Sequence, residues 1–152
     1  MIALLAKHFF GWRAALLALL AAFLSPSFYG HIFNNHKDIP FALGYVMTAY
    51  FLIVLLSEMP KAKFQTAFML ALGVGFSLSI RASGLAQFGF VFAFLGLHWL
   101  LYAKEKGKAF LSYIKLFLGI SIVAYIIGIA LWPMGLRNPI DGPITAFKEF
   151  SN

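Results

Sequence analysis

Apolar residues occur in long runs along the chain, and short polar segments separate these runs. Crossing the hydrocarbon core of a bilayer takes roughly 20 residues of α-helix, with a range of about 17–25. Each run has this length, or nearly so, and ends at a proline, a charged residue or a serine-proline cluster. The pattern predicts an all-α integral membrane protein of about five transmembrane helices, over residues 9–26, 39–57, 64–80, 82–103 and 110–132.

The first run is the least typical of a span, because its uninterrupted apolar core, Ala14–Leu24, is short. Such a segment also suits a tilted or interfacial helix. A cleaved signal peptide is the other interpretation, since Lys7 and Arg13 precede a short apolar stretch. Pro26 at the would-be cleavage motif and the apolar residues before Lys7 argue against cleavage.

The basic residues of the connecting segments predict the orientation, because Lys and Arg concentrate in short cytoplasmic loops. With five spans, the two sides of the membrane receive unequal numbers of them, which places the N-terminus in the cytoplasm and the C-terminus outside. The richer side holds Lys7, Arg13, Lys61, Lys63, Lys104, Lys106, Lys108 and Lys115, and the poorer side holds Lys37, Arg81, Arg137 and Lys148.

Composition supports the membrane class. The chain is 62% hydrophobic and only 11% charged, whereas soluble domains average roughly 25% charged residues. A soluble fold of this size could not bury so much apolar surface, so we expect one membrane domain over residues 1–152. The net charge of +7 then indicates contact with anionic lipid headgroups rather than with nucleic acid. The absence of cysteine excludes disulfides and thiol chemistry.

The connection between the first two predicted spans is unusually rich in polar side chains. It holds His31, Asn34, Asn35, His36, Lys37 and Asp38. Asp38 has two interpretations that can both hold. It suits the N-terminus of the following helix, as a cap and a partner of the helix dipole. Its carboxylate, at the membrane surface, could also take a proton from a substrate hydroxyl or bind a metal.

Two further features of the predicted outer face are candidates for chemistry. His31 and His36 could bind a metal from a loop, but their spacing does not place them on one helix face, and local hydrogen bonding at the headgroup level is the favoured interpretation. Arg81 interrupts an otherwise apolar run. An ionisable residue near membrane depth usually faces a polar cavity or a partner, although Arg81 at a hairpin tip could also snorkel into the headgroups. If Arg81 is functional, its planar cation suits phosphate.

Several of these segments resemble the middle of bacterial GT-C glycosyltransferases, the protein O-mannosyltransferase-like enzymes with a multi-helix membrane domain. The Asn-Asn-His-Lys-Asp-Ile-Pro-Phe-Ala run is the most specific of them. The resemblance covers nearly the whole chain and is carried by Phe10–Ala18, Ser25–His31, Phe33–Ala42, Gly73–Gly84, Leu131–Pro133, Asn138–Ile140 and Ala146–Phe147.

The resemblance implies transfer of a sugar from a polyprenyl-phosphate carrier to an acceptor on the outer face of the bacterial cytoplasmic membrane. Asp38 matches a second acidic position of the family, and Lys37 and Arg81 match basic positions expected to face the donor phosphate. Asn34 and Asn35 belong to the same run and are expected to bind substrate. A divalent metal such as Mg²⁺ is compatible with this chemistry, and the cofactor stays open.

One departure from the family limits what the resemblance implies. The family's main catalytic carboxylates lie in a first outer loop, and no segment here matches that loop. We therefore expect an internal portion of a larger membrane domain, whose partners are the lipid-linked sugar donor, membrane lipid and the remainder of the enzyme on another polypeptide. The alternative is a non-catalytic membrane protein, a transporter subunit or a scaffold. Transporters usually contain repeated halves, and no repeat is evident here.

Overall fold

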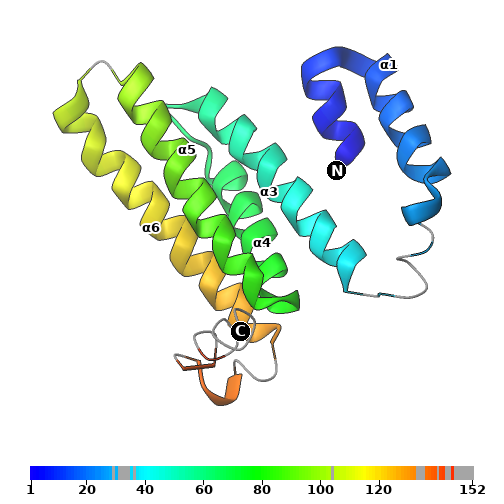
Figure 1. The fold of residues 1–152 in the computed structure, drawn as a ribbon. Coiled ribbons are helices and arrows are strands. Elements are labelled where there is room, and N and C mark those ends of the chain that lie inside the picture. Colours follow the sequence, from blue (N-terminus) through cyan, green and yellow to red (C-terminus); the bar gives the residue numbers. More distant parts are fainter. Residues whose placement is uncertain are drawn as a thin grey trace.

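The computed structural model describes residues 1–28, 30, 35, 37–103, 105–132, 136–139, 141–142 and 145. Within these residues every regular element is a helix (Figure 1), so the all-α prediction is confirmed for the described part of the chain. The elements are α1 (Ile2–Leu24), α3 (Asp38–Glu58), α4 (Phe64–Ile80), the 3₁₀ helix η1 (Ala82–Leu85), α5 (Ala86–Tyr102) and α6 (Lys106–Ala130).

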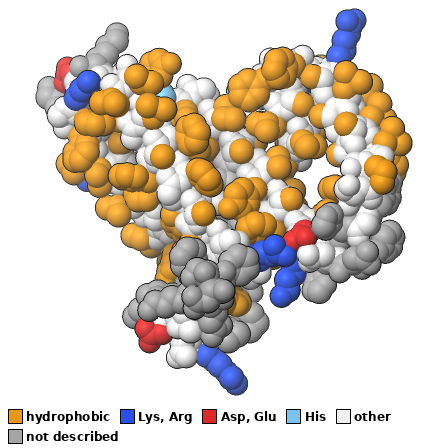
Figure 2. Space-filling view, in the orientation of Figure 1, with side chains coloured by type: hydrophobic (Ala, Val, Ile, Leu, Met, Phe, Trp, Pro, Cys, Tyr) orange, Lys and Arg blue, Asp and Glu red, His pale blue; other side chains and the backbone are white. Residues whose placement is uncertain are grey.

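The helices have the length and surface of a multi-pass membrane protein. Four stretches in the described residues are long and apolar enough to cross a bilayer, and the 17-residue α4 is a shorter apolar helix beside them. The 21 residues of α3 span about 31 Å at 1.5 Å per residue, which matches the roughly 30 Å hydrocarbon core. Apolar side chains are spread over the face of the helices that Figure 2 shows, and many large ones are exposed. Lipid is the solvent that suits such a surface.

The core lies where α4 packs between α3 and α6, and small residues allow the close approach. A Cβ atom on Gly44 of α3 would overlap Ser77 Oγ of α4, and one on Gly75 of α4 would lie 2.5 Å from the carbonyl oxygen of Ala124 in α6. Without a hydrophobic force between helices in lipid, such close backbone contact is a main source of association. Leu55, Leu70, Val74, Val91 and Ala124 fill the centre of this core.

The first helix differs from the predicted span 9–26. Helix α1 starts at Ile2 and is broken at Gly11, whose φ of 81° is a left-handed conformation that favours glycine. Figure 1 shows the two parts of α1 folded back beside each other at this break. The part after Gly11 is about 20 Å long at 1.5 Å per residue, which is short of the bilayer core, so α1 reaches the length of a span only when its two parts are counted together. α1 contacts α3 through the rings of His8 and Tyr50, 6.2 Å apart.

Candidate functional site

The candidate site lies at the end of the bundle where α3 begins and α4 ends. Asp38 is the first residue of α3, and Arg81 connects α4 to η1 in an extended conformation. Because α3 and α4 are consecutive antiparallel helices, these two residues reach the same end although they are distant in the sequence. We call this the Asp38 end, and we call the opposite end, with Lys61, Lys63 and Lys106, the basic end.

Asp38 and Arg81 form an ion pair. Nη2 of Arg81 lies 2.5 Å from Oδ1 of Asp38, and the side chains are 32% and 28% exposed, respectively. The guanidinium carbon of Arg81 also lies 5.7 Å from the centre of the Phe41 ring, one turn into α3. A charge-assisted hydrogen bond of this length is among the stronger polar contacts in proteins. The pair therefore joins the start of α3 to the end of α4, with both side chains still reachable from solvent.

Asn35 completes the environment of the Asp38 carboxylate. Its Nδ2 donates to Oδ2 of Asp38 at 2.6 Å, so Arg81 and Asn35 engage different oxygens of one carboxylate. The Asn35 backbone carbonyl accepts from the Asp38 N–H at 3.2 Å, and Asn35 Oδ1 lies 3.4 Å from the donating N–H of Lys37. Lys37 is exposed beside this turn. The structure thus brings together four of the residues that the sequence analysis selected: Asn35, Lys37, Asp38 and Arg81.

Glycines fix the position of Arg81 relative to α3. A Cβ atom on Gly84 of η1 would lie 2.6 Å from the backbone nitrogen of Leu78, so η1 packs directly on the last turn of α4. Ser77, in the same turn, donates to the Gly73 carbonyl at 3.0 Å and packs against Gly44 of α3. Close packing on both sides of the turn therefore leaves Arg81 facing the start of α3.

The start of α3 bears on the capping role considered for Asp38. Lys37 occupies the cap position of α3 and makes no side-chain capping bond, while Asp38 is the first helical residue. Its negative charge still suits the positive end of the helix dipole, but its carboxylate is directed to Arg81 and Asn35. Asn34, His31 and His36 lie outside the described residues. Within the described ones, no group of three or more His, Asp or Glu side chains could hold a metal ion.

Other polar contacts inside the bundle were not identified from the sequence. Thr48 Oγ1 of α3 donates to Oε1 of Gln87 in α5 at 2.6 Å, and Gln87 is 1% exposed. The sequence signal for this contact was Gln87 itself, an amide side chain in an otherwise apolar run. His98 Nδ1 and Tyr113 Oη, 2.8 Å apart, join α5 to α6 in a similar way. Both pairs connect helices within the bundle.

Comparison with known proteins finds no match for this chain. No protein-family model matches the chain, and neither the curated proteins nor the solved structures include a match. The function must therefore be argued from the resemblance in the sequence and from the arrangement of the residues at the Asp38 end.

Proposed function

We propose that this chain is part of a membrane glycosyltransferase that transfers a sugar from a polyprenyl-phosphate carrier to an acceptor at the outer face of a bacterial inner membrane. The observation that carries the proposal is the contact of Asp38, Arg81 and Asn35 at one end of the bundle. These residues come from two segments that resemble the glycosyltransferase family independently. A shared site requires these two segments to lie together, whereas two functionally unrelated loops would not need to be in contact.

The chemistry follows from the charges of the pair. Direct displacement at the sugar needs a base near the acceptor hydroxyl and positive charge near the departing phosphate. Asp38 is a carboxylate that can accept the hydroxyl proton. Nη2 of Arg81 contacts Asp38 at 2.5 Å, and a guanidinium has five N–H donors in a planar fork, so Arg81 has the donor capacity to bind phosphate oxygens as well. Lys37 adds a second cation beside them.

The described residues do not fit a divalent metal at this site. Mg²⁺ takes oxygen ligands in octahedral geometry, usually from one or two carboxylates together with phosphates and water. Here the Asp38 carboxylate already has Arg81 on one oxygen and Asn35 on the other. We therefore assign the phosphate-facing charge to Arg81 and Lys37 and derive no step through a metal.

The alternative function is a non-catalytic transporter subunit or scaffold. The same ion pair also supports it, as a structural contact between two helices. Arg81 and Asp38 neutralise each other across two helices, which is also what a brace would do at the membrane surface. A partly exposed pair of this kind contributes about 1–2 kcal/mol, between the values for exposed and buried pairs. The test must therefore distinguish a loss of stability, caused by breaking the ion pair, from a loss of transfer, caused by removing the catalytic base.

The first variant tests the carboxylate directly. Asp38→Asn keeps the shape of the side chain and removes its charge, so sugar transfer should fall at least tenfold. The measurement is incorporation of labelled sugar from a polyprenyl-phosphate donor, in membranes that contain this chain together with the rest of the transferase. Glu58→Gln at the basic end is the matched control, since it removes a carboxylate that is paired with Lys63 at 3.3 Å, and it should leave transfer within twofold.

A charge swap separates the two functions. The double variant Asp38→Arg with Arg81→Asp restores an ion pair between α3 and α4 but moves the carboxylate to the other chain segment. If the site is catalytic, the swap recovers the stability lost in Asp38→Arg alone without recovering transfer. If the swap also recovers transfer, or if Asp38→Asn transfers sugar at the normal rate, the pair is only a brace and the proposed function is wrong.

A further inference from the structure

A lysine on the lipid-facing side of α6 has no explanation in the proposed function. Lys115 is exposed and lies inside the apolar stretch Ala109–Ala130, roughly 9 Å from its start at 1.5 Å per residue. Lys115 belongs to neither of the ion pairs described above, Asp38–Arg81 and Glu58–Lys63. An ionisable side chain at this depth is costly and usually marks a binding site.

The surface beside Lys115 is a groove rather than a smooth helix face. Lys115 lines a hollow of about 210 Å³ between α4 and α6, together with Phe64 and Phe68, whose rings are stacked 6.2 Å apart. Ala67, Ala71 and Gly119 form its floor and leave it open for an apolar chain. A Cβ atom on Gly119 would meet nothing within 4 Å, which confirms that the groove is empty of protein at this point.

We propose that this groove binds an anionic phospholipid, with the lipid phosphate on Lys115 and one acyl chain between α4 and α6. The groove begins at Phe64, the first residue of α4, so it opens toward the basic end. Lysine side chains at this depth extend their ammonium toward the nearer headgroups. Lys61, exposed at the same end, adds to the positive potential that attracts anionic lipids in particular.

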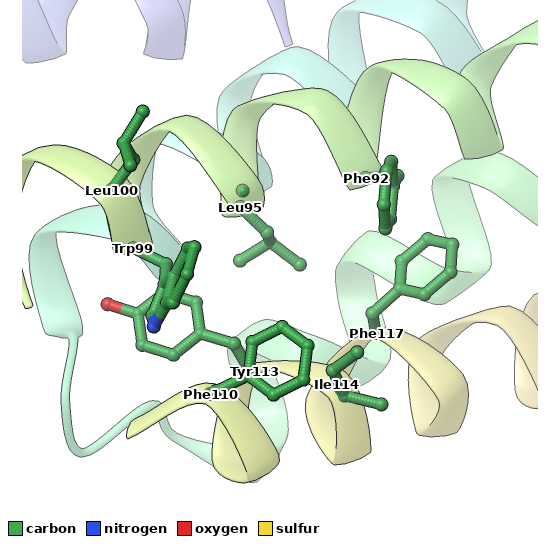
Figure 3. A pocket seen from close by; sticks show the side chains of 9 residues that line it. Phe92, Leu95, Trp99, Leu100, Phe110, Tyr113, Ile114 and Phe117 are labelled. Atoms are coloured by element: carbon green, nitrogen blue, oxygen red, sulfur yellow. The ribbon is translucent and has the colours of Figure 1, made fainter. Parts of the chain in front are cut away.

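A second groove shows what the charge adds. Between α5 and α6, a hollow of about 250 Å³ is lined by apolar and aromatic side chains, among them Phe92, Trp99 and Phe117 (Figure 3). None of its lining residues is charged. This groove can accept an acyl chain from any lipid, because nothing in it distinguishes one headgroup from another. Lys115 gives the α4–α6 groove the cation that can select an anionic headgroup.

The test measures lipid selectivity of the full chain in detergent. Phosphatidylglycerol and phosphatidylcholine are titrated separately, and bound lipid is counted by native mass spectrometry. We expect phosphatidylglycerol to bind at least tenfold more tightly than phosphatidylcholine, and Lys115→Gln to reduce this ratio below threefold. Lys106→Gln, which removes an exposed lysine outside the groove, should retain the ratio. An unchanged ratio in Lys115→Gln would overturn the proposal.

A second pair of variants tests the groove itself. Gly119→Leu adds an apolar side chain to this groove, and Gly96→Leu adds one to the α5–α6 groove; at both positions the Cβ atom meets no atom within 4 Å. Gly119→Leu should weaken phosphatidylglycerol binding at least fivefold, whereas Gly96→Leu should leave the selectivity unchanged. If Lys115 instead pairs with a carboxylate of a second copy, Lys115→Gln would dissociate a dimer in lipid-free detergent and leave lipid selectivity intact, which would also refute the lipid site.

Discussion

The two ends of the bundle each carry an ion pair, and the two pairs are built differently. Asp38 and Arg81 come from separate helical segments, lie 2.5 Å apart and are each about one third exposed. Glu58 and Lys63 lie on either side of a single turn, 3.3 Å apart, and the Lys63 side chain is 73% exposed. The first pair depends on how α3 and α4 pack, whereas the second needs only the local chain.

This difference indicates what each end is for. Glu58 Oε2 also accepts the backbone N–H of Lys63 at 3.1 Å, so the pair at the basic end orders the connection from α3 to α4. Exposed pairs of this kind contribute about 0–1 kcal/mol. At the Asp38 end, Asn35, Asp38, Arg81 and the ring of Phe41 converge on one point. A specific site is therefore expected at the Asp38 end, and a lipid-facing turn at the basic end.

The largest expected difference between the ends is their accessibility from solution. The chain contains no cysteine, so single cysteines can be introduced at exposed positions, as in Lys37→Cys at the Asp38 end and Gly107→Cys at the basic end. A membrane-impermeant maleimide should label the first in intact cells and the second only after permeabilisation. The reverse pattern would invert the orientation, and the proposed outer-face transfer would then be wrong.

The next largest effect concerns packing. Gly84→Ala places a Cβ atom 2.6 Å from the backbone nitrogen of Leu78, and the backbone cannot move aside as a flexible side chain would. We expect a loss of about 3 kcal/mol, at the upper end of overpacking effects, together with displacement of Arg81. Gly107→Ala at the basic end meets no atom within 4 Å and should change stability by less than about 1 kcal/mol. Unfolding in detergent, followed by helical circular dichroism, gives both values.

The smallest expected difference is between the contributions of the two ion pairs to the free energy of unfolding. Arg81→Gln should lower the free energy of unfolding by about 1–2 kcal/mol, because it leaves the partly buried Asp38 carboxylate without its counter-charge. Lys63→Gln should lower it much less, because the Lys63 side chain is 73% exposed and solvent screens its charge. Equal losses for the two variants would remove the distinction between the ends that the geometry indicates.

Much of the fold could be predicted because the signal for a membrane helix is local. The predicted range 64–80 coincides with α4, and 39–57 differs from α3 by one residue at each end. The range 82–103 is divided into η1 and α5, and α6 begins earlier than residue 110. The earlier start is understandable, since the polar first turn of a helix can extend beyond the hydrocarbon. Gly11 was missed because apolar residues surround it, and the break depends on a left-handed backbone.

The sequence alone determined the membrane class, the approximate spans and a set of candidate polar residues. The class and the spans follow from hydrophobicity over about 20 residues, which is a local property of each helix. Only the tertiary structure decided that Asp38 belongs with Arg81 and that Lys115 borders a groove. Both arrangements depend on the close packing of α4 against its neighbours, which the glycines Gly44, Gly75 and Gly84 allow. Such contacts join residues distant along the chain, and no local pattern specifies them.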